Sequence, residues 1–207
     1  MDNRTDIFWN CFSELKDKLM DIDSLSDEKA EELMLSLDKS LKEYSSGVDF
    51  IIGDLEQSGR KLTLTANGDI NFFQDVIFLC ENAPILDFWV IQAFLPAQGK
   101  NQVFDDGETE LKSKDLFFLP MESDTVKDKI GIRIAGKDLK INDSDFSCAY
   151  LLCEKMIGEY NATTMIDYFD LVDLPDNFEK EGFLPLDYLP DFVQWKMDLT
   201  ENKSKEN

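Results

Sequence analysis

Four aspartates near the C-terminal end recur at every third position, and grouped carboxylates of this kind can do chemistry. Carboxylate oxygens bind divalent cations, and a pair of carboxyl groups can perform acid–base catalysis without any histidine. Carboxylates spread along a strand and the loop after it are more often a solvated face. Spacing alone does not give ligand geometry. This aspartate cluster consists of Asp167, Asp170, Asp173 and Asp176. Its two interpretations are a site for metal binding or catalysis, and a solvated face without a function of its own.

Aromatic residues around the aspartate cluster indicate a third use, the binding of a protein partner. Tyr168 lies within the cluster, and Trp195 lies in the aromatic, proline-punctuated tail that follows it. Aromatic side chains beside carboxylates suit a partner surface that is basic and partly apolar. For Trp195, anchoring of the tail to its own domain is the favoured alternative. We expect the partner-binding residues to be Asp167, Tyr168, Asp170, Asp173, Asp176 and Trp195.

Residues 143–154 imitate a calcium-binding loop, with acidic residues at the first, third and twelfth positions. Such a loop needs glycine at its sixth position, where this chain has Cys148. Cys148 also belongs to a strong helical stripe of apolar residues. The segment is therefore predicted to be a helix N-terminus that is rich in acidic residues, without a metal.

The complete absence of histidine narrows the chemistry further. The lack of histidine excludes Ser-His-Asp and Cys-His catalytic sites, and it excludes zinc sites that need a histidine ligand. The four cysteines form no C-x-x-C pair, so we expect reduced core residues at Cys11, Cys80, Cys148 and Cys153. The chain also has no phosphate-loop motif. We expect no catalytic residue, no metal and no cofactor, and an enzyme is the less favoured class.

The charge of the chain limits its partners. Its 207 residues include 43 acidic and 21 basic ones, for a formal net charge of −22. This argues against nucleic acid and anionic membranes, because both attract Lys and Arg. It would steer a basic protein towards the chain, although acidity that only maintains solubility is the alternative. The isolated cations Arg60, Lys100 and Arg133 are expected to be surface charges.

The location of the protein is predicted from what the sequence lacks. No apolar run approaches the roughly 20 residues that a membrane-spanning helix needs. The N-terminal residues do not have the basic start and apolar stretch of a signal peptide. We therefore expect a cytoplasmic protein, and the sequence does not give its oligomeric state.

Hydrophobic periodicity predicts the elements that must position these residues. The expected helices cover residues 5–19, 26–44, 70–83 and 144–160, and the expected strands cover residues 48–55, 61–66, 88–95, 114–119, 126–135 and 163–172. The nearly unbroken apolar run at 88–95 is typical of a central strand buried on both faces. Residues 97–111 are expected to be a mobile loop.

These elements predict an α+β fold, a single domain with an antiparallel or mixed sheet of about five to six strands. An N-terminal helical hairpin and two further helices are expected to pack on this sheet. The predicted domain covers residues 1–199, with the hairpin at 5–44, the sheet and two helices at 48–172, and a C-terminal strap at 173–199. Residues 200–207 are expected to be a disordered tail.

Three pieces of the chain resemble a family of uncharacterised bacterial proteins. They are Phe8-Trp9-x-x-Phe12, the run Thr65-Ala66-Asn67-Gly68-Asp69 with the later Ala83-Pro84 and Trp89-x-x-x-Ala93-Phe94, and Gly158-Glu159-Tyr160 before a strand. Members look like small, acidic, cytosolic α+β proteins, and the resemblance covers most of the chain up to about residue 172. The motifs are mainly core and turn residues, so the resemblance implies a fold and carries over no catalytic residue. Related small acidic proteins look like partners in toxin–immunity loci, which implies a binding role.

Three functions follow as hypotheses. The favoured one is a non-enzymatic acidic protein-binding module, with an immunity or inhibitor protein that captures a basic partner as its specific form. The alternative is a carboxylate-dependent or metal-assisted enzyme that uses the aspartate cluster at residues 167–176. The third is a subunit of a larger assembly, in which the aromatic tail is an interface.

Overall fold

The computed structural model describes residues 3–122, 129–137, 139 and 141–205, and the chain divides into two compact units. The first unit is Met1–Leu95 and the second is Pro96–Asn207. Each unit has its own hydrophobic cluster of buried residues. The expected single domain over residues 1–199 stays a prediction.

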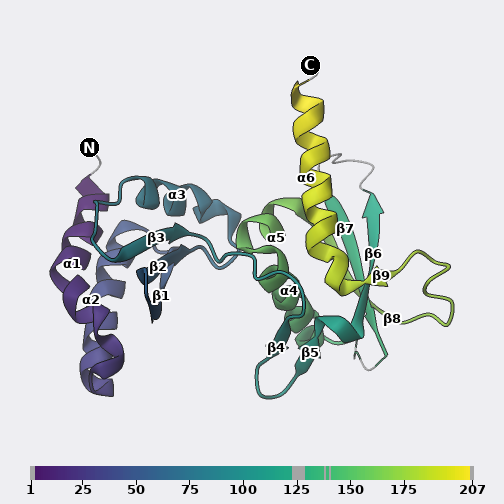
Figure 1. The fold of residues 1–207 in the computed structure, drawn as a ribbon, viewed down its shortest axis with the longest axis horizontal. Helices are drawn as coiled ribbons and strands as arrows, with labels where there is room; N and C mark the ends of the chain where they lie inside the picture. The colour runs from purple at the N-terminus through teal and green to yellow at the C-terminus, as the bar shows by residue number, and fades with distance from the viewer. Residues whose placement is uncertain (1–2, 123–128, 138, 140, 206–207) are drawn as a thin grey trace. The chain divides into compact units, whose positions relative to one another are not determined.

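The first unit consists of helices and a three-stranded mixed sheet (Figure 1). Its elements are α1 (Asn3–Met20), η1 (Ile22–Ser24), α2 (Asp27–Tyr44), β1 (Asp49–Glu56), β2 (Gly59–Thr65), η2 (Ile70–Phe72), α3 (Phe73–Glu81) and β3 (Trp89–Ala93). The strand order is β1-β2-β3, with β1 antiparallel and β3 parallel to β2. Because parallel neighbours need a crossover connection, α3 lies between β2 and β3 in the chain.

Aromatic side chains of α1 form much of the core of the first unit. Phe8 and Phe12 are fully buried, and the ring of Phe12 meets the ring of Trp89 edge to face at 4.8 Å. Trp9 is only 4% exposed, and its Nε1–H donates to the carbonyl oxygen of Leu79 at 3.1 Å. A buried indole N–H normally finds such a partner. The bond therefore ties α1 to α3.

Arg60 on β2 is 2% exposed, so the prediction that it is a surface charge is wrong. Its guanidinium Nη1 donates to the carbonyl oxygen of Gly53 at 3.0 Å, and Nη2 donates to the carboxylate of Asp23 in η1. The hydrogen bond from Arg60 is the main reason that the pKa of Asp23 is lowered, with Coulomb attraction as a smaller cause. Within the described residues, the buried Nε of Arg60 has no hydrogen-bond partner. The pair joins the turn of the helical hairpin to the sheet.

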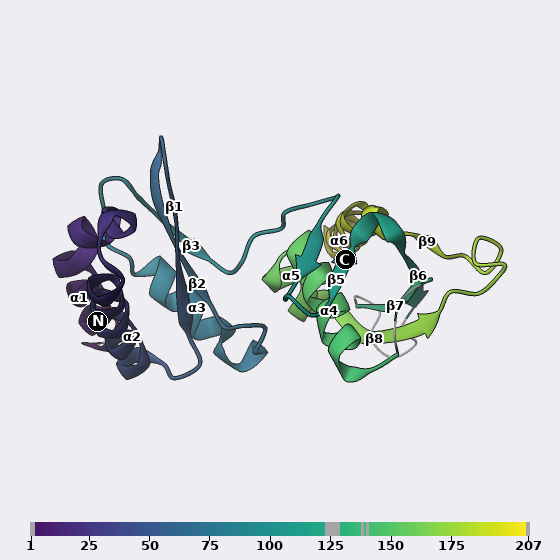
Figure 2. The same cartoon turned by 90° about the horizontal axis from the view of Figure 1, so that it is seen from below.

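The second unit contains a two-stranded and a four-stranded sheet with three α-helices. Its elements are β4 (Val103–Asp105), β5 (Glu110–Lys112), η3 (Ser113–Asp115), β6 (Leu116–Glu122), β7 (Ile130–Gly136), α4 (Asp143–Ile157), α5 (Glu159–Met165), β8 (Ile166–Asp173), β9 (Leu184–Pro185), η4 (Leu186–Tyr188) and α6 (Leu189–Lys205). The larger sheet has the order β8-β7-β6-β9, and β7 and β8 are parallel. The helices lie on one side of its long strands (Figure 2).

Alternation along β7 separates two faces of the four-stranded sheet. Ile130, Ile132 and Ile134 are at most 1% exposed and belong to the cluster that includes the buried residues of α4. The residues between them point to the opposite side, which we call the outer face. Strand register places these residues on the outer face: Phe117, Leu119, Met121, Gly131, Arg133, Ala135, Tyr168, Asp170 and Val172.

The α+β class is confirmed, but the prediction of one sheet of five to six strands is wrong, because the strands among the described residues form three sheets of three, two and four strands. The apolar run at 88–95 accounts for part of this error. Strand β3 is an edge strand rather than a central one, and Val90 on it is 42% exposed. The apolar run at 88–95 therefore forms an edge strand and not a strand that is buried on both faces.

Three other segments differ from their predicted form. The expected loop at 97–111 contains the β4–β5 hairpin. The expected helix at 144–160 ends at Ile157, because Gly158 has φ +84° and starts the separate helix α5. The expected strap forms β9, η4 and α6, and α6 extends to Lys205, into the segment that we expect to be disordered.

Replacing Gly59 by alanine tests the close approach of two chain segments in the first unit. Gly59 has φ +114°, and an added Cβ would lie 2.1 Å from the carbonyl oxygen of Phe88. We expect Gly59→Ala to lower the free energy of unfolding by about 2–4 kcal/mol in urea titrations. The control Gly107→Ala has φ +87° with nothing within 4 Å of its added Cβ, and should cost about 1 kcal/mol. Equal losses would contradict the close approach.

The Arg60–Asp23 pair predicts a pH dependence of stability. The folded-state pKa of Asp23 lies below its ordinary value of 3.8. The stabilisation is therefore complete above that value and is lost as the pH falls through the folded-state pKa. Asp23→Asn should be less stable than the wild type at about pH 6, and the difference should shrink towards about pH 3. Urea unfolding at both pH values measures this, and a difference that does not change with pH would refute the role of the carboxylate.

Candidate partner-binding surface

Strand β8 does not gather the aspartate cluster on one face. β8 is the edge strand next to β7, and its pairing shifts register between the partners Ile130–Ile166 and Gly131–Tyr168. The shift leaves Asp167 as the extra residue of a bulge. Beyond the bulge, side chains alternate, so residues three apart point to opposite sides of the sheet. The regular spacing in the sequence therefore has no counterpart in space.

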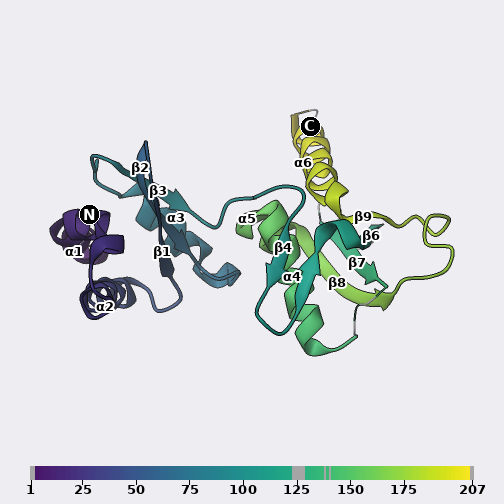
Figure 3. The same ribbon diagram turned by 60° about the horizontal axis from the view of Figure 1, so that its bottom comes forward.

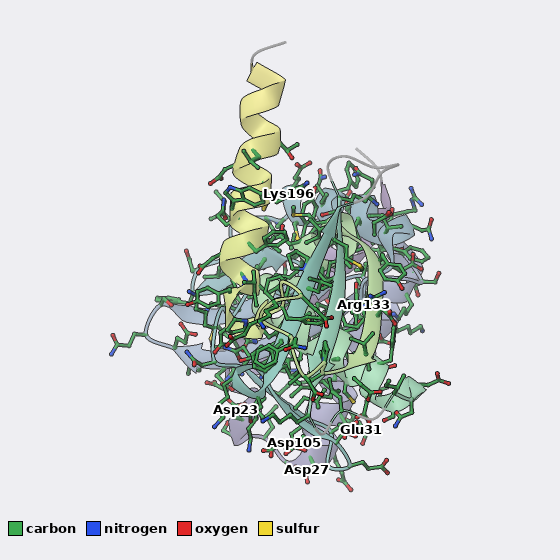
Figure 4. All side chains as sticks on the ribbon, turned by 90° about the vertical axis from the view of Figure 1, so that its right-hand side faces the viewer. Asp23, Asp27, Glu31, Asp105, Arg133 and Lys196 are labelled. Atoms are coloured by element: carbon green, nitrogen blue, oxygen red, sulfur yellow. The ribbon has the colours of Figure 1, made fainter. Side chains whose placement is uncertain are left out.

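Asp170 is held by two donors on the outer face. Arg133 Nε donates to Asp170 Oδ2 at 3.2 Å, and the hydroxyl of Tyr168 donates to the same oxygen at 3.1 Å. The side chains of Arg133 and Asp170 are 35% and 33% exposed. Strand register sets this contact, since Arg133 on β7 is the direct neighbour of Asp170 on β8. Figure 4 labels Arg133 on the strands of the second unit.

Three aspartates of the cluster are exposed to solvent. Asp167 and Asp173 lie near the two ends of β8, and Asp176 lies in the loop that connects β8 to β9. This loop is anchored to the outer face by Phe178, whose ring centroid is 4.6 Å from that of Phe117. Tyr168, with 48% of its surface exposed, lies beside Asp167 in the chain. Tyr168 therefore lies next to the exposed Asp167 in the chain and its hydroxyl is held by Asp170, whereas Asp173 and Asp176 lie farther along the chain.

Trp195 lies on a different element from the rest of the predicted site. It is 53% exposed on α6, and its ring centroid is 5.6 Å from that of Phe192. Helix α6 packs against α4 and η4, whereas β8 pairs with β7. The structure thus brings Tyr168 and Asp170 together and places Trp195 on a helix of the sheet's other side.

Arg133 is the residue that sequence reasoning missed. It is isolated in the sequence and is expected there to be a surface charge. In the structure it donates to Asp170, which also accepts from Tyr168. Among the described residues, Tyr168 and Asp170 are the only members of the predicted site whose side chains are hydrogen-bonded to each other. One signal was present: alternation of Ile130, Ile132 and Ile134 places Arg133 on the less buried face of its strand. The partner across the strand pair could not be derived from that pattern.

The calcium-loop segment is helical, as predicted. The side chain of Asn142 caps α4 by accepting a hydrogen bond from the backbone N–H of Asp145 at 2.8 Å. Cys148 is buried, and its Sγ lies 3.4 Å from Asp106 Oδ2. Across the described ranges, no group of three or more Cys, Asp or Glu side chains is placed to hold a metal ion.

The half-buried carboxyl group with a raised pKa lies outside the aspartate cluster. Burial raises the pKa of Glu154 on α4, and the nearby charge of Glu159 raises it further. A raised carboxyl pKa is a property of general acids, although structural networks produce it too. The enzymatic hypothesis named residues 167–176, and Glu154 is not among them.

Comparison of the chain with protein-family models, with curated proteins and with solved structures gives no match. In the part of the chain that the structure describes, no helix has the length and apolar character needed to cross a membrane.

A double-mutant cycle tests whether Arg133 and Asp170 interact in solution. We expect a coupling free energy of roughly 0.5 kcal/mol between Arg133→Met and Asp170→Asn, because the pair is partly exposed and solvent screens it. The cycle is measured by urea unfolding. The more exposed pair Lys61–Glu56, with side chains 44% and 55% exposed, is the control and should show a smaller coupling. Zero coupling in the first cycle would show that the outer-face contact does not persist in water.

Proposed function

We propose that the protein is a non-enzymatic acidic binding module that captures a basic protein partner, as an immunity or inhibitor protein would. The support is the net charge of −22 together with an exposed aromatic residue, Tyr168, next to the exposed Asp167 in the second unit. The cytoplasm is the proposed location of this interaction.

The observation that carries the proposal is the environment of Tyr168. Its ring is half exposed, its hydroxyl is bonded to Asp170, and Asp167 precedes it at the bulge. Tyrosine is enriched at interaction hot spots because it offers a large contact area with few rotatable bonds. A ring whose hydroxyl is already bonded loses less entropy when a partner packs against it.

The proposed mechanism has two steps. The field of the acidic chain first steers a basic partner towards it, which raises the association rate. Asp167, Asp173 and Asp176 contribute to this attraction as exposed charges. The partner then packs against Tyr168, and this contact determines the dissociation rate. Inhibition would follow from steric blocking of the partner's own site.

A second proposal, that the chain is a subunit of a larger assembly, is favoured by a stripe on α6 and the turn before it. Tyr188, Trp195 and Leu199 are 53%, 53% and 37% exposed and follow helical spacing, with Phe192 between them. Lys100 lies 5.6 Å from the ring centroid of Tyr188 and forms an ion pair with Asp191 at 2.6 Å. Disruption of the stripe by Trp195→Ser should lower the molecular mass seen by light scattering if α6 is an interface.

Charge reversal at the exposed aspartates tests the first proposal. The partner is the protein that a native pull-down retains at low salt, and its binding to each variant is measured by surface plasmon resonance. We expect the triple variant Asp167→Lys, Asp173→Lys, Asp176→Lys to weaken binding at least about tenfold, largely through slower association. The control reverses the same number of exposed acids in the first unit: Glu14→Lys, Glu31→Lys, Glu32→Lys.

The control distinguishes a specific surface from total charge. Glu31 is labelled in Figure 4 and lies on α2, away from β8 in the chain. Equal losses in both variants would show that only net charge matters and would refute the assigned residues. Unchanged binding in the β8 variant would refute the proposal itself.

A further inference from the structure

One end of the sheet in the first unit carries a hollow and several exposed apolar side chains. The β1–β2 turn lies there, and Arg60 at the start of β2 pairs with Trp89 at the start of β3. The loop from α3 to β3, residues 82–88, therefore ends beside this turn (Figure 3). We call this region the hairpin end and define it by Met20, Leu55, Glu56, Asp87, Phe88 and Trp89.

Phe88 at the hairpin end has an unfavourable backbone conformation and an unfavourable environment. Its φ is +60°, in the left-handed region that bulky residues avoid, and its side chain is 73% exposed. The backbone N–H of Arg60 donates to the carbonyl oxygen of Phe88 at 2.9 Å, and Gly59 allows the close approach. The fold thus maintains a strained residue whose ring gains little from burial. Strain of this kind is found at binding sites more often than elsewhere.

The neighbouring side chains extend this apolar surface. Leu55 is 55% exposed, and Ile85 in the same loop is fully exposed. Scattered apolar residues are ordinary on a protein surface, but several at one place mark an interaction site. Leu55 and Phe88 line a cavity of about 460 Å³, and Met20 and Trp89 complete its apolar lining.

The charges around the cavity favour a cationic occupant. Asp17, Glu56 and Asp87 line it together with one cation, Lys16. Lys16 is paired with Asp17 at 3.1 Å, and Glu56 is paired with Lys61 at 3.2 Å. Asp87 takes part in no ion pair within the described residues, so one carboxylate remains uncompensated beside the exposed ring of Phe88.

We propose that the hairpin end docks a basic, partly apolar segment of a partner protein, with a lysine or arginine side chain in the cavity. The aliphatic stem of that side chain packs on Leu55 and Trp89, and its charged end meets Asp87 and the face of Phe88. The inference rests on the proposed function, because it takes the partner to be basic. It adds a contact surface in the first unit, apart from the residues of β8.

A titration with a basic model peptide tests the docking surface. The full chain, labelled with ¹⁵N, is titrated with acetyl-Lys-Leu-Lys-Leu-Lys-amide and, as a control, with acetyl-Glu-Leu-Glu-Leu-Glu-amide. We expect saturable amide shifts at Leu55, Asp87, Phe88 and Trp89 with the basic peptide. The acidic peptide should bind at least about tenfold more weakly. Equal binding of both peptides at the hairpin end would overturn the choice of a cationic occupant.

Two variants separate binding from folding. Phe88→Gly removes the ring and relieves the positive φ, so the urea midpoint should stay equal or rise while affinity for the basic peptide falls at least about fivefold. Asp87→Asn should weaken the same binding about threefold and leave the urea midpoint unchanged. The matched control is Phe78→Ala, an aromatic residue 41% exposed on α3, which should change affinity less than about twofold.

The outcomes distinguish this inference from the proposed function. If the basic peptide shifts only β8 residues and Phe88→Gly binds it normally, the docking surface is wrong and the acidic binding module stands. If neither peptide binds, the docking surface is refuted, and the charge-reversal variants with the retained partner decide the acidic binding module separately. If Phe88→Gly lowers the urea midpoint, the affinity of the Asp87→Asn variant for the basic peptide becomes the test. An unchanged affinity of that variant would refute the docking surface at the hairpin end.

Discussion

The first unit depends on one buried cation. Arg60 lies almost completely inside the unit, where an unpaired charge would be very costly, and its guanidinium is paired with Asp23 and the carbonyl oxygen of Gly53. Because Asp23 lies in the turn between α1 and α2, the pair fixes the helical hairpin against β2. The backbone of the same residue holds the carbonyl of Phe88. One arginine therefore connects the core of the unit to the strained loop at its edge.

The second unit uses the same chemistry with less burial. Arg133 and Asp170 pair across adjacent parallel strands, on the face that the isoleucines of β7 leave outside the core. A pair that is one-third exposed contributes little to stability, but its carboxylate holds the hydroxyl of Tyr168. The exposed ring of Tyr168 beside the exposed Asp167 is a combination that a basic protein surface can recognise. In the proposed function, the high negative charge of the chain would act at longer range, on the rate of encounter with a basic partner.

Local patterns in the sequence predicted the elements but not their assembly. Helical spacing located α1 and α2. Strand order could not be obtained, because apolar residues at 88–95 are compatible with a central strand and with the edge strand that is observed. The sequence pattern placed the carboxylates on a strand. The bulge at Asp167 and the contact between Asp170 and Arg133 depend on the register between β7 and β8, and alternation within one strand does not predict that register. Likewise, the residues near Arg60 in the chain do not indicate that its guanidinium is buried and paired with Asp23.

We propose that the field of an acidic surface captures a basic partner. The association rate constant of the wild-type chain with its retained partner, measured at increasing ionic strength, tests this capture. We expect the association rate to fall steeply as salt rises, with a much smaller change in the dissociation rate. An association rate that is independent of salt, or a partner that is itself acidic, would refute electrostatic capture.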